Sequence, residues 1–202
     1  MAMPESSLSR VAAVVAVVSF VVAAPVVGVV SFSGSSSAMQ ASTYAVAQGT
    51  TCATVSPVTD TGQNVTEFYD YRNPYPDITG NPFALTYSSY GTIEYQETSG
   101  SVLFFYEGSE GASAVFLHDR LGDEDGGSTL TMSFDDLPAG GEWVVQDDRY
   151  PERDDDWSLG GASATIDWKW GPNRTDGGAF RGVGDLDGAI EITPGFNEDA
   201  AH

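Results

Sequence analysis

Short runs in which apolar and polar residues alternate recur along this chain. In residues 163–170, for example, Ile166 and Trp168 share one face of the run, while Asp167 and Lys169 share the other. Successive side chains of a β-strand point to opposite faces, so this alternation predicts strands with one face in a core and one in solvent. The runs of this kind are residues 92–97, 129–134, 163–170 and 190–193.

Two further runs are apolar on both faces. Residues 102–106 and 114–117 carry aliphatic or aromatic side chains throughout. Strands covered on both sides have this composition, so we expect the two runs to lie in the centre of a sheet. The Gly-Ser-Glu-Gly connection at residues 108–111 is short enough to predict a β-hairpin between them.

With residues 83–89 and 143–145 added, the pattern predicts about eight strands. No part of the domain carries the apolar stripe of an amphipathic helix. Many short strands with glycine-rich connections are typical of an all-β fold, which we predict to be an antiparallel β-sandwich or an open barrel. Residues 63–82 contain two Asn-Pro pairs and are predicted to form a long loop.

The N-terminal region has a different character. Residues 11–32 are almost entirely apolar, and at about 20 residues the run is long enough to cross a bilayer. Arg10 precedes it, which places residues 33 onward outside the cell by the positive-inside tendency. We therefore predict an extracellular protein, or one on the outer face of the cell membrane, with an N-terminal export or anchor helix that makes no contact with the β domain.

Cleavage and anchoring both remain open for this segment. The small residues of Ser36-Ser37-Ala38 and of Ala45-Val46-Ala47 suit a signal peptidase. The length of the apolar run exceeds the roughly 7–15 residues of a signal-peptide core and favours a membrane anchor. We divide the chain into residues 1–38, a signal peptide or membrane anchor with a Ser-rich spacer, and residues 44–200, a single β domain.

The excess of acidic residues indicates the kind of solvent in which the protein works. The 202 residues include 29 Asp and Glu but 8 Lys and Arg, so the formal net charge is -21, and Lys169 is the only lysine. The many negative charges repel one another and weaken the fold in dilute buffer. At molar salt, where the Debye length is about 3 Å, this repulsion is screened, so the composition indicates a halophile. The same acidity argues against nucleic-acid binding, which needs a basic surface. With 41% hydrophobic and 11% aromatic residues, the chain has enough apolar material for a core.

Several stretches in the second half of the chain have sequences typical of one group of proteins. Residues 168–182 read WKWGPNRTDGGAFRG and residues 190–198 read IEITPGFNE, and they are preceded by LP at 137–138 and EWVVQDD at 142–148. In these stretches the chain resembles uncharacterised exported acidic β-sandwich proteins of haloarchaea. The resemblance implies a source and a compartment, and it carries over no site residue.

Catalytic motifs are missing from the sequence. It contains no Gly-x-Ser-x-Gly elbow, no phosphate-binding glycine loop and no His-Glu-x-x-His. A Ser/His/Asp arrangement would have to use His118, beside Asp119, and we interpret this histidine as a strand-end residue bonded to a loop. Cys52 is the only cysteine, which excludes an intrachain disulfide, and we interpret it as a small hydrophobic residue.

Acidic loops are the one feature with a direct chemical rationale. Calcium takes several oxygen ligands, which turns rich in carboxylates supply. The Asp125 and Asp185/Asp187 loops do not fit an EF-hand, because the end positions of that frame would be apolar. The alternative is that these loops are only hydrated surface. If an ordered cation exists, we expect it in the C-terminal half, with ligands drawn from Asp147, Asp148, Asp154, Asp155, Asp156, Asp185 and Asp187.

Aromatic residues and sequons complete the candidates. Trp143, Trp168 and Trp170 lie on the apolar faces of their predicted strands and are assigned to the core. Trp157 follows three aspartates in a predicted loop with Tyr150 nearby, so it is either a sugar-binding ring or a lid over the core. Asn-x-Thr sequons permit glycosylation at Asn64 and Asn173.

Two classes of function follow from these features. The favoured one is a non-catalytic structural or interaction module, exported or on the cell surface of a halophile, with a glycan or protein partner. The alternative is a calcium-supported carbohydrate-binding module, and a secreted hydrolase comes third. An exposed aromatic strip beside converging carboxylates would favour carbohydrate binding, whereas a closed apolar core would favour the structural module.

Overall fold

The computed structural model describes residues 43–72, 88–122, 126–149, 154–184, 186 and 188–196, and two residues of the N-terminal region, 30 and 31. For residues 30, 31 and 88 it describes the backbone alone. Apart from residues 30 and 31, the predicted export or anchor segment lies outside the described residues. Within them, no helix is long and apolar enough to cross a membrane.

Two sheets make up most of the described chain. The larger sheet consists, in spatial order, of β11 (Asp156–Leu159), β12 (Ala164–Trp170), β9 (Ser128–Asp135), β14 (Glu191–Phe196), β1 (Val30–Ser31), β2 (Tyr44–Gln48) and β3 (Thr51–Val55). The smaller sheet consists of β10 (Glu142–Gln146), β13 (Asp176–Arg181), β8 (Gly111–His118), β7 (Ser101–Gly108) and β4 (Val58–Thr59). Strands β5 (Tyr71–Arg72) and β6 (Ser88–Ser89) pair separately.

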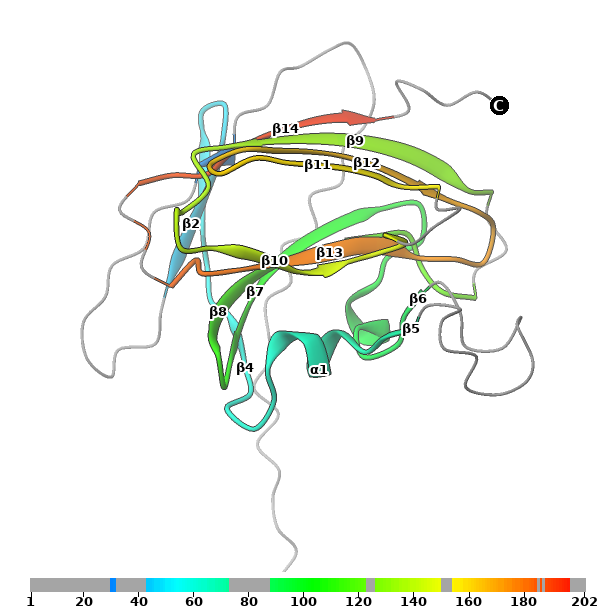
Figure 1. Ribbon diagram of the computed structural model, residues 1–202, viewed down its shortest axis with the longest axis horizontal. Helices are drawn as coiled ribbons and strands as arrows, with labels where there is room; N and C mark the ends of the chain where they lie inside the picture. The colour runs from blue at the N-terminus through cyan, green and yellow to red at the C-terminus, as the bar shows by residue number, and fades with distance from the viewer. Residues whose placement is uncertain are drawn as a thin grey trace, which may run out of the picture.

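The sheets are layered and neither closes on itself (Figure 1). Neighbouring strands are antiparallel, except that β4 runs parallel to β7. The prediction of an all-β chain is confirmed, and the runs at 129–134, 143–145, 163–170 and 190–193 lie in β9, β10, β12 and β14. Of the predicted strand at 83–89, the structure describes only β6.

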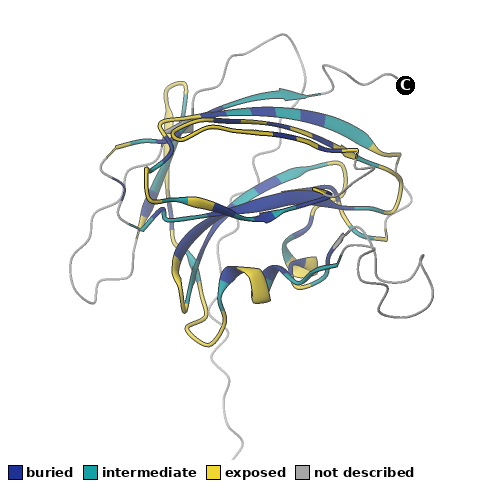
Figure 2. Ribbon diagram, in the orientation of Figure 1, coloured by how far each residue is buried: buried dark blue, intermediate teal, exposed yellow. Residues whose placement is uncertain are grey.

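The predicted central hairpin is confirmed. Strands β7 and β8 pair from Ser101↔His118 to Gly108↔Gly111, and both lie inside the five-stranded sheet. Figure 2 shows buried residues running almost without interruption along the central strands β8 and β13 of this sheet, whereas β9 and β12 of the larger sheet alternate between buried and more exposed positions. This difference follows from coverage, because the described residues cover both faces of the smaller sheet and one face of the larger sheet.

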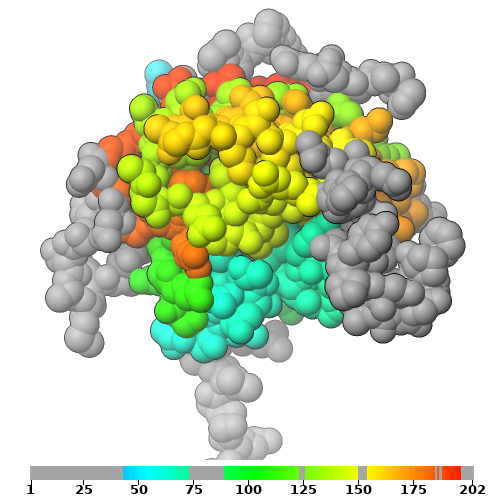
Figure 3. Space-filling view, viewed as in Figure 1, coloured from blue at the N-terminus to red at the C-terminus, as the bar shows by residue number. Residues whose placement is uncertain are grey.

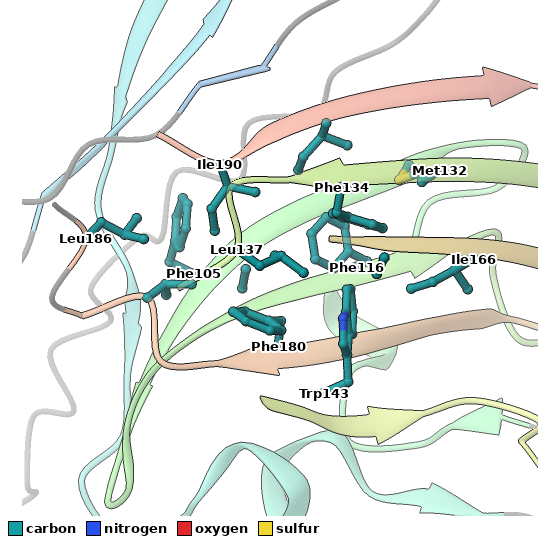
Figure 4. Packing of buried hydrophobic residues seen from close by; sticks show 14 of the residues in the cluster. Phe105, Phe116, Met132, Phe134, Leu137, Trp143, Ile166, Phe180, Leu186 and Ile190 are labelled. Carbon is teal, nitrogen blue, oxygen red and sulfur yellow. The ribbon is translucent and has the colours of Figure 1, made fainter. Parts of the chain in front are cut away.

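The first core lies between the sheets. Phe105, Phe116 and Phe180 from the smaller sheet meet Phe134 from β9, with Trp143 among them (Figure 4). The ring of Phe134 lies edge-on to both Phe116 and Trp143, at 5.2 and 5.0 Å between centroids. Edge-to-face packing of this kind adds specificity to the burial of apolar area.

The second core lies on the other face of the smaller sheet, beneath helix α1 (Val65–Tyr69) and the 3₁₀ helix η1 (Ile93–Tyr95). Phe68 of α1 stacks on Tyr106 at 4.2 Å, and Tyr95 of η1 stacks on Phe104 at 4.9 Å. In the space-filling view, the segment containing α1 (cyan) lies directly below the yellow-green segment that includes β10 (Figure 3). Strands β7 and β8 are apolar on both faces because one face packs in the first core and the other in this second core.

Two predictions of local structure are corrected here. The predicted loop at 63–82 contains α1, which begins at a capping box in which Asn64 and Glu67 bond each other's backbone N–H. At 92–97 the alternation predicted a strand, but the chain forms η1, with Ile93 exposed and Gln96 buried. Both helices are single turns, too short to show a helical apolar stripe.

The end of the N-terminal apolar run joins the larger sheet. Val30 pairs with Ile192 of β14 and with Gln48 of β2. The prediction that residues 11–32 make no contact with the β domain is therefore wrong for Val30 and Ser31. One of the two candidate cleavage positions, Ala47, lies within β2.

Candidate functional site: a buried aspartate cluster

Four aspartates that are distant in sequence are buried at the ends of three strands. Asp147 and Asp148 follow β10, Asp155 precedes β11, and Asp176 begins β13. Their exposed fractions are 1%, 7%, 1% and 2%. Strands β10 and β13 are paired, with Gln146 opposite Gly178, so the Asp147 turn lies beside the start of β13. We call these four residues the aspartate cluster.

Two tyrosines from the α1 side hold the first pair of carboxylates. The hydroxyl of Tyr69 donates to Asp147 Oδ2 at 3.2 Å, and that of Tyr71 donates to Asp148 Oδ1 at 2.7 Å. The Tyr71 hydroxyl also accepts the backbone N–H of Asp148 at 2.8 Å. Helix α1 and β5 therefore position the acidic turn after β10.

Backbone N–H groups hold the second pair. Lys169 N donates to Asp155 Oδ1 at 2.9 Å, and Gly177 N donates to Asp176 Oδ1 at 2.7 Å. Gly177 has a φ of +150°, and a Cβ there would lie 2.0 Å from the carbonyl oxygen of Phe116. Only glycine fits this position, so the local geometry that anchors Asp176 is specified by sequence.

The remaining oxygens of this cluster are poorly supplied with donors. Asp147 Oδ1 and Asp176 Oδ2 are buried and have no hydrogen-bond partner among the described residues. A buried carboxylate oxygen without a donor is costly, because burial removes the hydration of its charge. Two buried carboxylate oxygens of the cluster therefore lack a donor among the described residues.

The pKa values of the carboxyls report the same imbalance. Burial, followed by the charges of Asp176 and Asp148, raises the pKa of Asp147 well above its ordinary value. Burial and the charges of Asp176 and Asp147 raise the pKa of Asp155 to about 12. Burial and the charge of Asp148 raise the pKa of Asp176.

Asp148 stands at the edge of the cluster. Burial raises its pKa to about 7, while the hydrogen bond from Tyr71 and the positive charge of Arg174 act in the opposite direction. The charge of Asp154, which is exposed, also raises this pKa. Neutral Tyr69 is favoured as well, since burial and the nearby charge of Asp147 raise its pKa.

The placement of Trp157 corrects its assignment to a loop. It lies in β11 with 7% of its surface exposed, and its ring packs edge-on against Trp143 and Trp168. Its indole N–H donates to the carbonyl oxygen of Asp147 at 3.0 Å. Trp157 is therefore a core residue that supports the aspartate cluster, not an exposed sugar-binding ring. Its predicted companion, Tyr150, lies outside the described residues.

The structure brings together three of the seven candidate metal ligands, namely Asp147, Asp148 and Asp155. Asp154 is exposed at the cluster's edge, and Asp156 is exposed on β11 opposite Asp167. The candidates Asp185 and Asp187 lie outside the described residues. In the part of the chain that is described, no group of three or more acidic, histidine or cysteine side chains stands as a formed metal site.

Asp176 was missed by the sequence analysis. It sits singly in Thr-Asp-Gly-Gly rather than in an acidic run, and glycine-rich residues 176–181 carry no apolar alternation that would predict strand β13. The available signal was the Asp-Gly-Gly sequence itself, where a carboxylate precedes a position restricted to glycine.

His118 lies in a second buried polar site, at the end of β8. It is fully buried, with Nδ1 2.9 Å from the Ser101 hydroxyl oxygen of β7, and the rings of Trp168 and Trp170 flank it. The sequence predicted a bond from His118 to a loop, but the ring is bonded to the neighbouring strand β7. Burial lowers the pKa of His118 to about 3, so the imidazole is neutral.

The neighbouring Asp119 does not orient this histidine. Asp119 Oδ1 accepts the backbone N–H groups of Ser99 and Arg120, both at 2.9 Å, and Oδ2 accepts the indole N–H of Trp170 at 2.8 Å. A catalytic triad needs a carboxylate bonded to the histidine ring. The carboxylate of Asp119 instead ties a turn to the core.

Three other candidates have defined positions. Cys52, interpreted from the sequence as a small hydrophobic residue, is exposed on β3 and belongs to neither hydrophobic core. The Asn64 amide serves the α1 cap and lies 3.5 Å from Glu110 Oε1, whereas Asn173 is exposed in a turn. Of the two sequons, the one at Asn173 is the more accessible.

Comparison with known proteins adds no relative. No protein-family model, curated protein or solved structure matches the chain.

Proposed function

We propose that this chain is a non-catalytic β-sandwich module, exported or held on the cell surface of a halophile, with a structural or interaction role. The observation that carries the proposal is the position of the aromatic rings. Trp143, Trp157 and Trp168 are buried in the first core, and among the described residues the only large hydrophobic side chains that are exposed are Ile93 and Leu159. A carbohydrate-binding face requires exposed rings, so this arrangement favours the structural module.

The buried polar site around His118 also favours a non-catalytic role over a secreted hydrolase. His118 is enclosed by tryptophan rings and bonds Ser101 through Nδ1, while the carboxylate of Asp119 is engaged elsewhere. General acid–base chemistry needs a histidine that substrate can reach and that titrates near the working pH. His118 has neither property.

The exposed acids support the high-salt environment. Asp156 and Asp167 lie directly opposite each other on β11 and β12, and both are exposed. Like charges at paired positions destabilise a sheet in dilute buffer, and molar salt screens that repulsion. The net charge of -21 extends the same effect over the whole chain.

A salt series tests the environment. The melting temperature of the full chain should rise from dilute buffer to molar KCl, and an Asp156→Lys variant should gain most of its added stability at low salt. Asp156→Asn serves as the matched control, since it removes the repulsion without adding an attraction. A melting temperature that does not depend on KCl would contradict a halophilic origin.

A binding screen tests the role. The full chain, in molar KCl with and without chelator, should bind no polysaccharide and hydrolyse no ester, glycoside or peptide. Specific binding to a polysaccharide that weakens in Trp170→Ala but not in Asp156→Asn would favour the carbohydrate-binding alternative. Trp170 is the appropriate target because it is the partly buried ring at the margin of the first core.

The position at which a signal peptidase cuts the chain decides whether the first core stays intact. Cleavage after Ala47 would remove Tyr44, whose ring is 1% exposed and stacks on Phe105 at 3.9 Å. Cleavage after Ala38, or retention of the segment as an anchor, preserves this contact. N-terminal sequencing of the exported protein distinguishes these cases, and it also tests whether β1 belongs to the mature sheet.

A further inference from the structure

The aspartate cluster presents the same pattern four times. One oxygen of each carboxylate is fixed by a donor: Tyr69 for Asp147, Tyr71 for Asp148, and the backbone N–H groups of Lys169 and Gly177 for Asp155 and Asp176. Carboxylates that bind metals are commonly oriented in this way, by hydrogen bonds from groups that do not touch the metal. In Asp147 and Asp176 this pattern leaves the second oxygen for another partner.

Two of those second oxygens are orphaned. Asp147 Oδ1 and Asp176 Oδ2 are buried without a hydrogen-bond partner among the described residues, in side chains that are 1% and 2% exposed. The two residues are neighbours in the fold, because Gln146 pairs with Gly178 between β10 and β13, and the charge of Asp176 raises the pKa of Asp147. A cation between them would satisfy both oxygens and offset the mutual repulsion.

Nearby positive charge is limited. Arg174 acts on Asp148, at the edge of the cluster, and Lys169 contributes its backbone N–H to Asp155, while its side chain is on the exposed face of β12. Among the described residues, the four buried carboxylates outnumber the positive charges that act on them, which leaves an excess of negative charge in a poorly solvated place. Either protons or a bound cation must balance it.

We propose that the aspartate cluster is a binding site for a divalent cation, Ca²⁺, with Asp147 and Asp176 as direct ligands and Asp155 and Asp148 beside them. Calcium accepts an all-oxygen, irregular ligand set that includes carboxylates, backbone carbonyls and water. Magnesium demands regular octahedral geometry and keeps more of its water, which suits a buried site less well. This inference is independent of the proposed function.

Binding requires the carboxylates to close on the ion. In the described residues no three of these side chains are arranged around a common point. The indole N–H of Trp157 donates to the carbonyl oxygen of Asp147, so a movement of Asp147 changes the surroundings of this ring. Its fluorescence should therefore change when the cation binds.

Calcium titration of the full chain tests the site. The protein is purified in mild detergent and molar KCl, freed of cations by chelation, and titrated with CaCl₂ by calorimetry and tryptophan fluorescence. We expect saturable binding of a single Ca²⁺ per chain, an increase in melting temperature on binding, and weaker binding of Mg²⁺. Affinity should fall more than about tenfold in Asp176→Asn and in Asp147→Asn.

The control is Asp156→Asn, which removes the same charge from an exposed position next to Asp155. It should bind Ca²⁺ as the unaltered chain does. Asp176→Asn should stay folded in chelator, since it removes a buried charge, and near-ultraviolet circular dichroism checks this.

Two results would overturn the proposal. Weak, non-saturating heats that are the same in the unaltered chain and in Asp176→Asn would mean that the acids only attract counter-ions. Infrared bands of protonated carboxyls that disappear in Asp176→Asn but persist at high CaCl₂ would mean that the cluster is balanced by protons.

Discussion

Among the described residues, buried carboxylates lie in two places that supply them with different numbers of hydrogen-bond donors. Asp119 is 3% exposed and its carboxylate accepts three N–H groups, from Ser99, Arg120 and Trp170. In the aspartate cluster, by contrast, Asp147 and Asp176 each keep an oxygen that no described residue satisfies. The two places are close, since Asp176 pairs with His118 across β13 and β8.

The difference shows what is needed to bury a carboxylate. At Asp119 the fold supplies a donor for each oxygen, so the charge is stabilising and complete without any partner from solution. In the aspartate cluster the fold supplies about one donor per carboxylate and sets the carboxylates against each other, which costs stability unless a proton or cation enters. The first site is a structural tie, and the second is the site that we propose for a cation.

Asp119→Ala should have the largest effect on stability. Three N–H donors, in residues that are exposed or partly buried, would lose their acceptor, and alanine does not favour the left-handed backbone at this position, where φ is +64°. We expect the free energy of unfolding to fall by about 3 kcal/mol in molar KCl, with or without calcium. Denaturant titration measures it. Asp119→Asn, which tolerates the backbone, should lose less, and a loss of under about 1 kcal/mol in Asp119→Ala would contradict the comparison.

Asp176→Asn should act in the opposite direction in chelator. The folded-state pKa values of the cluster are raised, so the unfolded chain releases these protons first and stability falls as pH rises from about 4 through about 7 and beyond. The variant should flatten this slope and be more stable than the unaltered chain by about 2 kcal/mol near pH 8. Thermal melts over pH measure it, with Asp156→Asn as control. An identical slope in Asp176→Asn and the unaltered chain would count against a role for the cluster.

His118→Gln should show a smaller effect of the opposite sign. The folded-state pKa of His118 is lowered to about 3, from 6.5 in the unfolded chain, so its contribution to stability is lost as pH falls below 6.5. Between about pH 6.5 and about pH 5 the unaltered chain should lose about 1.5 kcal/mol more than the variant. The Gln amide can keep the bond to Ser101. A loss that is equal in the two proteins would mean that folding does not lower the pKa of His118.

Strand prediction succeeded where a strand carries its own pattern. Strands β9, β12 and β14 alternate, and β7 and β8 are apolar throughout, so their positions follow from side-chain period. Strand β13, Asp-Gly-Gly-Ala-Phe-Arg, was missed because its glycines are selected by close packing: a Cβ on Gly178 would lie 2.8 Å from the Trp157 ring. That constraint comes from another strand and has no local signature.

The candidate site was predicted in part. Acid-rich turns marked Asp147, Asp148 and Asp155, but the same criterion also marked Asp156, which is exposed, and passed over Asp176, which is buried. Alternation in β11 places Asp156 and Trp157 on opposite faces, and this was hidden because the segment was interpreted as a loop. Acid density finds charged turns without saying which side chains face inward.

By itself, the sequence determined the all-β class, the central hairpin and the acidic character of the chain. These depend on residue type and on the two-residue period of a strand, which are local properties. Only the tertiary structure decided which acids are buried together. Asp147, Asp155 and Asp176 meet because β10, β11 and β13 end near one another, with α1 and β5 supplying the tyrosines. An aspartate reads the same in a sequence whether water or other carboxylates surround it, and packing between distant segments sets that difference.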